Sequence, residues 1–305
     1  MDLIARIAPF FAIIAAGAVA GRLGLLGPRL GAWLSAYTFW IGFPALLIRW
    51  LGDAPAPEAG QGLAMGLYGL TMTLLLAGAW VAARRMGLAK ETAAGLPMVS
   101  GLGNTAFLGA PLAVAVLGEG IRAQAAALVA IDFILLMGLA VAILQTGTAA
   151  VGLPGALRRV LANPTVLGAA CGLGLSASQT RLPGPIDQLL TWLALTASPV
   201  ALIALGGLIG REGAWPRRRD QGPLALALAI KLALAPLLVW LVLGAGDAAP
   251  ELRATATLLA ACPTAVNVFI QTRNMGVFAR GAAEAVIAGT VLSAISLTVI
   301  AHFLA

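Results

Sequence analysis

The sequence has few charged residues, few cysteines and a single histidine. Of its 305 residues, 10% are charged and 60% are hydrophobic, whereas ordinary soluble chains have about 25% and about 45–50% of these types. So few charges cannot cover a soluble fold of this length. Two cysteines, Cys171 and Cys262, are too few for a disulfide framework, and His302 alone cannot form a His/Cys metal cluster. The composition indicates an all-α polytopic membrane protein, in which we expect no metal and no cofactor.

Apolar stretches divide the chain into ten predicted membrane-spanning helices. Ten spans of roughly 20 residues leave loops of about ten residues, which is too short for a soluble domain. The predicted spans, helices 1 to 10, are 5–24, 32–51, 62–83, 93–117, 123–146, 163–180, 187–210, 223–244, 254–275 and 281–304. Helix 1 has small residues that resemble a signal-peptide cleavage site, but its apolar run is longer than a usual signal core. We expect it to remain in the mature protein.

Lysine and arginine gather in alternate loops, which predicts the orientation. One set of loops holds thirteen of them: Arg22, Arg29, Arg84, Arg85, Lys90, Arg158, Arg159, Arg211, Arg217, Arg218, Arg219, Arg273 and Arg280. The opposite side holds five: Arg6, Arg49, Arg122, Arg181 and Arg253. This imbalance predicts a cell inner (plasma) membrane protein with both termini on the outer side. The basic residues form no single patch, so the net charge of +7 favours contact with anionic lipid rather than nucleic acid.

Five predicted helices precede the 147–162 connection and five follow it. An odd number of spans in each half makes the second half enter the membrane from the opposite side, so a structural repeat here is an inverted one. We predict two five-helix repeats, 1–150 and 151–305. The segments "FPALLI" with Pro44 and "SPVALI" with Pro199 support the repeat, because they lie at matching places in helices 2 and 7.

Helices 4 and 9 contain residues that interrupt a helix. Helix 4 has Pro97, Gly101, Gly103, Asn104, Thr105, Gly109 and Pro111 within fifteen residues, and helix 9 has Cys262, Pro263, Thr264 and Asn267 near its middle. Proline removes a backbone donor and glycine disfavours helix. Unpaired backbone groups are costly in hydrocarbon, so such breaks persist only where they are buried in protein or line a polar cavity. We therefore expect both helices to break near the membrane midplane.

Two matched breaks favour a binding site for an anion. Half-helix N-termini present positive dipole ends, the amides of Asn104 and Asn267 can donate to a carboxylate, and Thr105 and Thr264 add hydroxyl groups. The alternative is that both helices have ordinary proline kinks with polar caps. The pairing of the breaks favours the functional interpretation.

Two charges lie deep in predicted spans, Asp132 in helix 5 and Lys231 in helix 8. A charge at the bilayer centre costs at least roughly 2.5–3.5 kcal/mol, so each needs a cavity or a partner. They can pair with each other, or Asp132 can carry a coupling proton while Lys231 attracts the anion or braces a broken helix. Gln145 and Glu284 lie nearer the ends of their spans, and we expect them to be solvated.

The segments "GNTAFLGAPLAVAVLGEG" and "CPTAVNVFIQTRNMG" resemble the two signature regions of the auxin efflux carrier family, which includes bacterial malate and malonate permeases. The resemblance implies ten helices in an inverted repeat with crossing helices 4 and 9, a scaffold of helices 1, 2, 6 and 7, and a mobile transport unit of helices 3–5 and 8–10. It also implies homodimers that carry small organic anions by an elevator-like shift. The family's asparagine and proline match Asn104 and Pro111 in helix 4, and Asn267 and Pro263 in helix 9.

The leading hypothesis is a secondary transporter of a small carboxylate such as malate, malonate or an auxin-like acid. The long loop of the plant members between helices 5 and 6 is missing, which favours a bacterial metabolite carrier. Coupling to protons or sodium, or none, stays open. One alternative is a carrier like the bile-acid/sodium symporters, which should place several acidic or amide sodium ligands beside the crossing. Another is a membrane sensor that binds ligand without transport.

Overall fold

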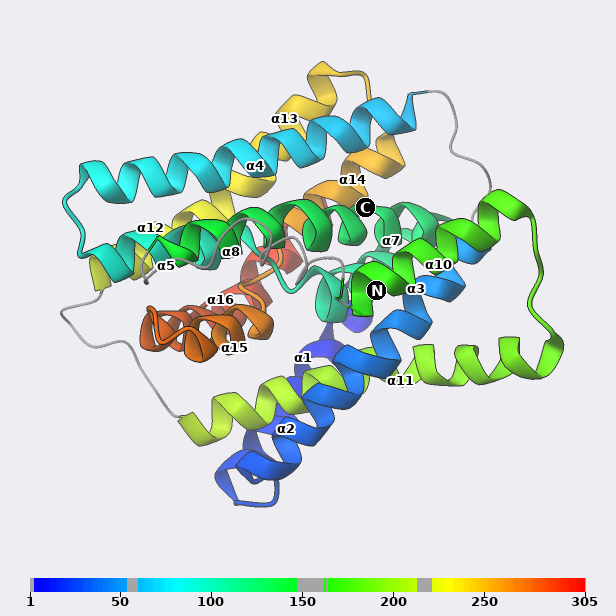
Figure 1. Cartoon of the computed structure of the whole chain (residues 1–305), viewed down its shortest axis with the longest axis horizontal. Helices are drawn as coiled ribbons and strands as arrows, with labels where there is room; N and C mark the ends of the chain where they lie inside the picture. Colours follow the sequence, from blue (N-terminus) through cyan, green and yellow to red (C-terminus); the bar gives the residue numbers. More distant parts are fainter. Residues whose placement is uncertain (1–2, 54–59, 147–161, 163, 213–220, 305) are drawn as a thin grey trace. The chain divides into compact units, whose positions relative to one another are not determined.

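The computed structural model describes residues 3–53, 60–146, 162, 164–212 and 221–304 (Figure 1). The secondary structure of these residues is helical, and one isolated β-bridge is the only β-type pairing among them. Helical stretches occupy all ten predicted spans, with ends that differ by a few residues. The predicted repeat boundary at 150/151 and the basic residues Arg158, Arg159, Arg217, Arg218 and Arg219 lie outside the described residues.

Seven described helical stretches are long and apolar enough to cross a membrane. They are Leu3–Arg22, Pro28–Gly52, Gln61–Arg85, Glu119–Gln145, Gly184–Arg211, Gln221–Ala245 and Ala279–Leu304, and the shorter apolar helices are Thr105–Leu117 and Val166–Ser178. Length and hydropathy therefore make the chain a multi-pass membrane protein, as its composition predicts.

Backbone contacts divide the chain into two compact units. The first unit comprises Met1–Ala59, Ala106–Ala130 and Leu161–Gly213. Its helices are α1 (Leu3–Arg22), α2 (Pro28–Tyr37), α3 (Phe43–Gly52), α6 (Ala110–Leu117), α7 (Arg122–Ile131), α10 (Pro164–Ser178) and α11 (Gly184–Glu212), with a π-turn η1 (Thr38–Gly42) joining α2 to α3 and a 3-10 turn η3 (Glu119–Ile121) before α7.

Glycines set the close packing of α1 on α11. A Cβ added to Gly206 would lie 2.0 Å from the carbonyl oxygen of Ile14, and one added to Gly210 would lie 2.0 Å from that of Ala18. Gly17 faces the carbonyl of Ile203 in the same way, at 2.4 Å. Because no side chain larger than hydrogen fits, the two backbones touch directly, which is the main source of helix association in lipid.

The same device joins α3 to α10. A Cβ on Gly168 would lie 2.8 Å from the Cα atom of Pro44, and one on Gly172 would lie 2.8 Å from the carbonyl oxygen of Leu47.

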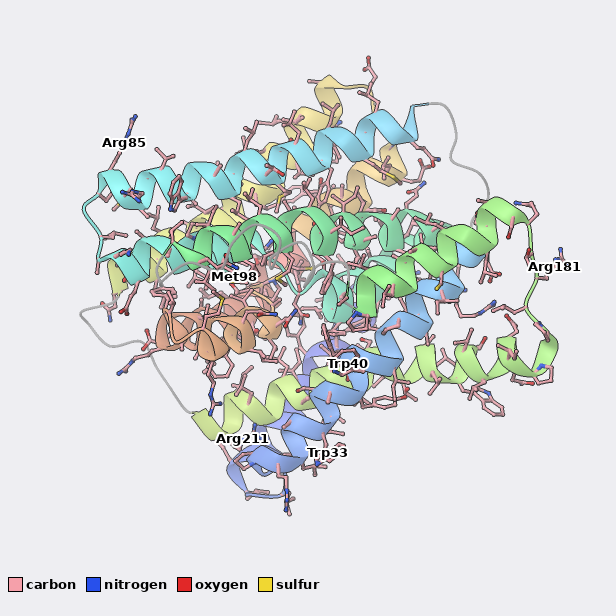
Figure 2. All side chains as sticks on the ribbon, in the orientation of Figure 1. Trp33, Trp40, Arg85, Met98, Arg181 and Arg211 are labelled. Carbon is pink, nitrogen blue, oxygen red and sulfur yellow. The ribbon has the colours of Figure 1, made fainter. Side chains whose placement is uncertain are left out.

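Elsewhere in this unit, Trp33 and Trp40 stand out from α2 and η1 with 71% and 62% of their surface exposed (Figure 2). Exposed tryptophans suit a surface that faces lipid or its headgroups.

The second unit comprises Gly60–Thr105, Ile131–Val160 and Ala214–Ala305. Its helices are α4 (Gln61–Arg85), α5 (Lys90–Gly101), α8 (Met137–Gln145), α12 (Gln221–Ala229), α13 (Ala235–Ala245), α14 (Pro250–Ala260), α15 (Val266–Asn274) and α16 (Ala279–Leu304). The π-turns η4 (Asp132–Leu136) and η6 (Ile230–Leu234) precede α8 and α13, and a third π-turn, η2 (Thr105–Gly109), begins in this unit and leads to α6. Within the unit α4 packs on α5 and α13, and α13 packs on α14 (Figure 1).

Candidate functional site

The two predicted helix breaks are present, and their backbones pair with each other inside the second unit. After α5 ends at Gly101, Leu102 is extended. Where the chain leaves α14 at Ala260, Ala265 is extended before α15 begins. Gly103 and Thr264 form an antiparallel bridge, in which the N–H of Asn104 donates to the carbonyl of Pro263 at 2.7 Å and the N–H of Ala265 donates to the carbonyl of Leu102 at 3.1 Å. Backbone groups freed by each break are thus satisfied by the other.

Side chains satisfy two more carbonyls where the first half-helices end. The Thr264 hydroxyl donates to the carbonyl of Val99 in α5 at 2.7 Å. Lys231 Nζ donates to the carbonyl of Ala260 at 2.9 Å, where the negative end of the α14 dipole lies. Gly103 leaves space for this ammonium group, since a Cβ there would lie 2.9 Å from Nζ. Of the alternatives for Lys231, the structure favours the brace of a broken helix.

Two buried polar atoms beside the bridge have no hydrogen-bond partner. They are Asn104 Oδ1 and Asn267 Nδ2, both within three residues of Gly103 or Thr264 along the chain, whereas the Thr105 hydroxyl interacts with the Asp132 carboxylate. Asn104 and Thr105 are 2% and 1% exposed. Buried polar groups in folded proteins almost always have partners, so a cluster of unpartnered ones at a helix break is typical of a place where a ligand supplies the partner.

The other predicted site residues contribute backbone contacts or lie outside the paired breaks. The Thr264 hydroxyl donates to the carbonyl of Val99, and the carbonyl of Pro263 accepts from the N–H of Asn104. Pro111 lies in the first turn of α6, and α6 belongs to the first unit. The second unit therefore brings together Asn104, Thr105, Pro263, Thr264 and Asn267.

Asp132 and Lys231 are both buried in the second unit, at 6% and 0% exposed, and each lies in a π-turn. The Asp132 carboxylate accepts a hydrogen bond of 2.8 Å from the Tyr68 hydroxyl. Among the described residues no ion pair joins Asp132 to Lys231, and their role as a structural pair stays a prediction. They remain electrostatic neighbours, together with Cys262, so the cluster holds one charge of each sign beside the bridge. π-turns of this kind often mark functional positions.

Gln145 and Glu284 are not solvated, which corrects the expectation from their places near span ends. Gln145 is 6% exposed at the end of α8, and Glu284 is 1% exposed in α16. Glu284 Oε1 accepts from Arg280 Nε at 3.0 Å, whereas its Oε2 has no partner. The position of a residue near the end of a span does not predict that it is exposed, because neighbouring helices of the same unit cover these two side chains.

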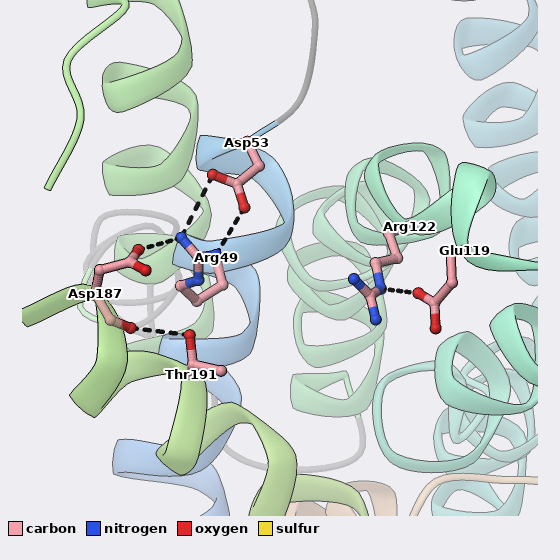
Figure 3. A network of polar contacts seen from close by, with 6 residues as sticks. All are labelled: Arg49, Asp53, Glu119, Arg122, Asp187 and Thr191. Carbon is pink, nitrogen blue, oxygen red and sulfur yellow. Dashed lines mark hydrogen bonds and ion pairs between the residues drawn. The ribbon is translucent and has the colours of Figure 1, made fainter. Parts of the chain in front are cut away.

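A charged network in the first unit is the other polar cluster of note (Figure 3). Arg49 contacts both Asp53, at 2.8 Å, and Asp187, and Arg122 contacts Glu119. A cavity of about 330 Å³ lies between these pairs, walled by apolar side chains including Leu46 and Leu195. Because both guanidinium groups already contact carboxylates, the network offers an anion little net attraction.

The fold and the paired breaks define a class, a multi-pass membrane protein with a polar cluster held at interrupted helices. The chain matches the family of membrane transport proteins over residues 2–153 and 151–301, and it belongs to that family, the auxin efflux carriers that its two motifs resemble. It is also similar to a Rhizobium meliloti (strain 1021) protein named "Putative malonate transporter", with 27% identity over 308 residues that cover 97% of this chain and 94% of that protein. The protein is a membrane transporter and not an enzyme.

Proposed function

We propose that the protein is a secondary transporter of a small organic anion, bound where the broken helices α5 and α14 pair. The observation that carries this proposal is the pair of buried, unpartnered polar atoms Asn104 Oδ1 and Asn267 Nδ2. Asn267 Nδ2 is a donor and can hydrogen-bond a carboxylate, whereas Asn104 Oδ1 is an acceptor, so Asn104 donates to the anion through its own Nδ2 group.

The electrostatics beside the bridge favour an anion. The helix α15 begins at Val266 without a side-chain cap, so its first N–H groups and its positive dipole end lie next to Asn267. The ammonium group of Lys231 lies beside Gly103. It uses one of its three N–H donors in the hydrogen bond to the carbonyl of Ala260. These donors come from two separate helical elements, α15 and η6.

The substrate we favour is a small dicarboxylate such as malonate or malate. The relative's name includes malonate, and two carboxylates suit donors that come from two facing breaks. An auxin-like monocarboxylate would engage one set of donors and leave the other buried without a partner, which costs about 1–3 kcal/mol per group.

The proposed architecture is an inverted repeat of two five-helix halves that works by an elevator-type shift. Two helix pairs support the repeat: α1 packs on α11 and α3 packs on α10, which are helices 1 with 7 and 2 with 6, and exchanging the two halves converts one pair into the other. The first compact unit contains helices 1, 2, 6 and 7 together with Ala106–Ala130, which supports a scaffold built from those four helices. We further propose a homodimer in the inner membrane.

The test is uptake of labelled malonate into proteoliposomes by the purified protein and by Asn104→Ala and Asn267→Ala. Each change removes a hydrogen bond to a charged group, worth about 1.5–3 kcal/mol, so the affinity for malonate should fall about ten- to a hundredfold. The control is Gln124→Ala, which removes another unpartnered buried amide oxygen, from α7 in the first unit. Normal binding and transport by both asparagine variants would show that the site lies elsewhere.

Two further measurements separate the alternatives. Sodium-dependent uptake would favour a carrier of the bile-acid/sodium symporter type, whereas malonate binding without flux into sealed vesicles would favour a sensor. A panel of mono- and dicarboxylates, compared by the thermal stabilisation they give the purified protein, ranks the substrates because a ligand of the folded state raises its stability.

A further inference from the structure

A separate cavity lies at one end of the second unit. It has a volume of about 240 Å³ and is lined by Trp80, Arg84, Leu88, Lys90, Ala93, Ala94 and Thr146. These residues come from the end of α4, the short connection to α5, the start of α5 and the residue after α8. None of them belongs to the paired breaks, so this cavity is distinct from the proposed substrate site.

The charge of this cavity is positive. Arg84 and Lys90 line it, no carboxylate does among the residues that the structure describes, and the ion pairs of those residues include neither of them. The Arg84 guanidinium lies 5.4 Å from the centre of the Trp80 ring, a cation–π contact that holds the side chain over the cavity wall. Two cations on neighbouring helices, with no ion-pair partner in the described part of the chain, form a receptor for an anion.

The cavity also lies at the level of the lipid headgroups. The helix α4 is long and apolar enough to span a membrane and ends at Arg85, and the stretch that includes α8 ends at Gln145. Two spans therefore end beside the cavity. Trp80 lies little more than one turn before the end of α4, where an indole ring suits the membrane–water interface. The first N–H groups of α5, which have no side-chain cap, add partial positive charge at the same end.

We propose that this cavity binds the phosphate of an anionic phospholipid headgroup, such as that of phosphatidylglycerol. Arg84 and Lys90 contact the phosphate oxygens, and the Trp80 ring and Leu88 contact the glycerol backbone of the lipid. The cavity is smaller than the roughly 300–1,000 Å³ of sites that enclose a whole small molecule, which suits a headgroup whose acyl chains remain in the bilayer. Basic pockets between membrane helices bind headgroups in this way.

The test compares two double variants that remove the same charge. Arg84→Gln with Lys90→Gln removes both cations from the cavity. The control, Arg29→Gln with Arg85→Gln, removes two exposed arginines that do not line it, and Arg85 points away from α4 into the surroundings (Figure 2). Each protein is placed in nanodiscs of phosphatidylcholine with and without phosphatidylglycerol, and retained lipid is counted by native mass spectrometry alongside thermal stability.

We expect the wild-type protein and the control to retain phosphatidylglycerol and to gain stability from it. The cavity variant should need at least about tenfold more of this lipid for the same gain, while its stability in phosphatidylcholine is unchanged because both side chains are exposed. Equal loss in both double variants would show a general surface-charge effect and would overturn the proposal. Equal stabilisation of detergent-solubilised wild-type protein by inorganic phosphate, lost in the cavity variant, would assign the cavity to a soluble anion instead and would also overturn it.

Discussion

At the scale of single residues, the two buried charges beside the helix breaks have different kinds of partner. Asp132 accepts from the Tyr68 hydroxyl, and Lys231 donates to the backbone carbonyl of Ala260. The sequence predicts that each needs a partner, because an isolated charge in a span is costly. It does not predict which partner, since Tyr68 is 64 residues from Asp132 and a backbone carbonyl leaves no trace in a sequence pattern.

Replacing Tyr68 with phenylalanine should destabilise the protein. The change removes the donor to a buried carboxylate while keeping the ring, and a hydrogen bond to a charged group contributes about 1.5–3 kcal/mol. Denaturation in detergent micelles measures the loss. Tyr37→Phe is the matched control, because its hydroxyl bonds the Thr196 hydroxyl in an exposed place and its loss should cost about 0.5 kcal/mol or less. Equal destabilisation by the two changes would contradict a special role for the contact between Tyr68 and Asp132.

Replacing Asp132 with asparagine should abolish the pH dependence of transport. Asparagine keeps an oxygen that accepts from Tyr68 but cannot exchange a proton, so a coupling role is lost while the local contact remains. Malonate uptake between pH 5 and 8 by wild-type and variant proteoliposomes measures this. Lys231, Tyr68 and Cys262 are the other titratable groups of the cluster. A variant that keeps the full pH profile would make Asp132 a structural residue.

At the scale of elements, the sequence predicts the two broken helices but not how they are tied together. Proline and glycine mark both interruptions because they act on the local backbone, and the helix boundaries follow the apolar runs for the same local reason. The tie between Thr264 and Val99 joins residues 165 apart, and nothing local encodes it. The sequence predicts a ligand contact for Thr264, and the structure adds that its hydroxyl donates to the carbonyl of Val99 in the other broken helix.

Small residues mark helix contacts in the sequence, and the structure distinguishes those that are essential from those that are not. Gly206→Ala places a methyl group 2.0 Å from the carbonyl oxygen of Ile14, so α1 and α11 must move apart at a cost of about 3 kcal/mol or more. Gly174→Ala in α10 meets nothing within 4 Å and should stabilise the helix by about 0.5–1 kcal/mol. Unfolding in detergent measures both. If Gly206→Ala were as stable as Gly174→Ala, α1 and α11 would not be in direct backbone contact.

At the scale of the whole molecule, the orientation in the membrane depends on charge counts alone. Helix geometry is the same for either direction of insertion, so the excess of lysine and arginine in alternate loops is what distinguishes them. Five of the thirteen residues on the predicted cytoplasmic side lie outside the described residues. The remaining eight still outnumber the five on the opposite side, and the predicted direction does not depend on the five residues outside the description.

Single cysteines on the two faces should therefore react from opposite sides of the membrane. In a Cys171→Ser background, where Cys262 is fully buried, Arg181→Cys should react with a membrane-impermeant maleimide in intact cells. Met86→Cys, at a position that is 59% exposed, should react only after the membrane is permeabilised. Arg181 is exposed beyond the end of α10 (Figure 2), so the reagent can reach both positions from the appropriate side. The reverse pattern would place both termini in the cytoplasm, and the basic loops would then face outward against the charge rule.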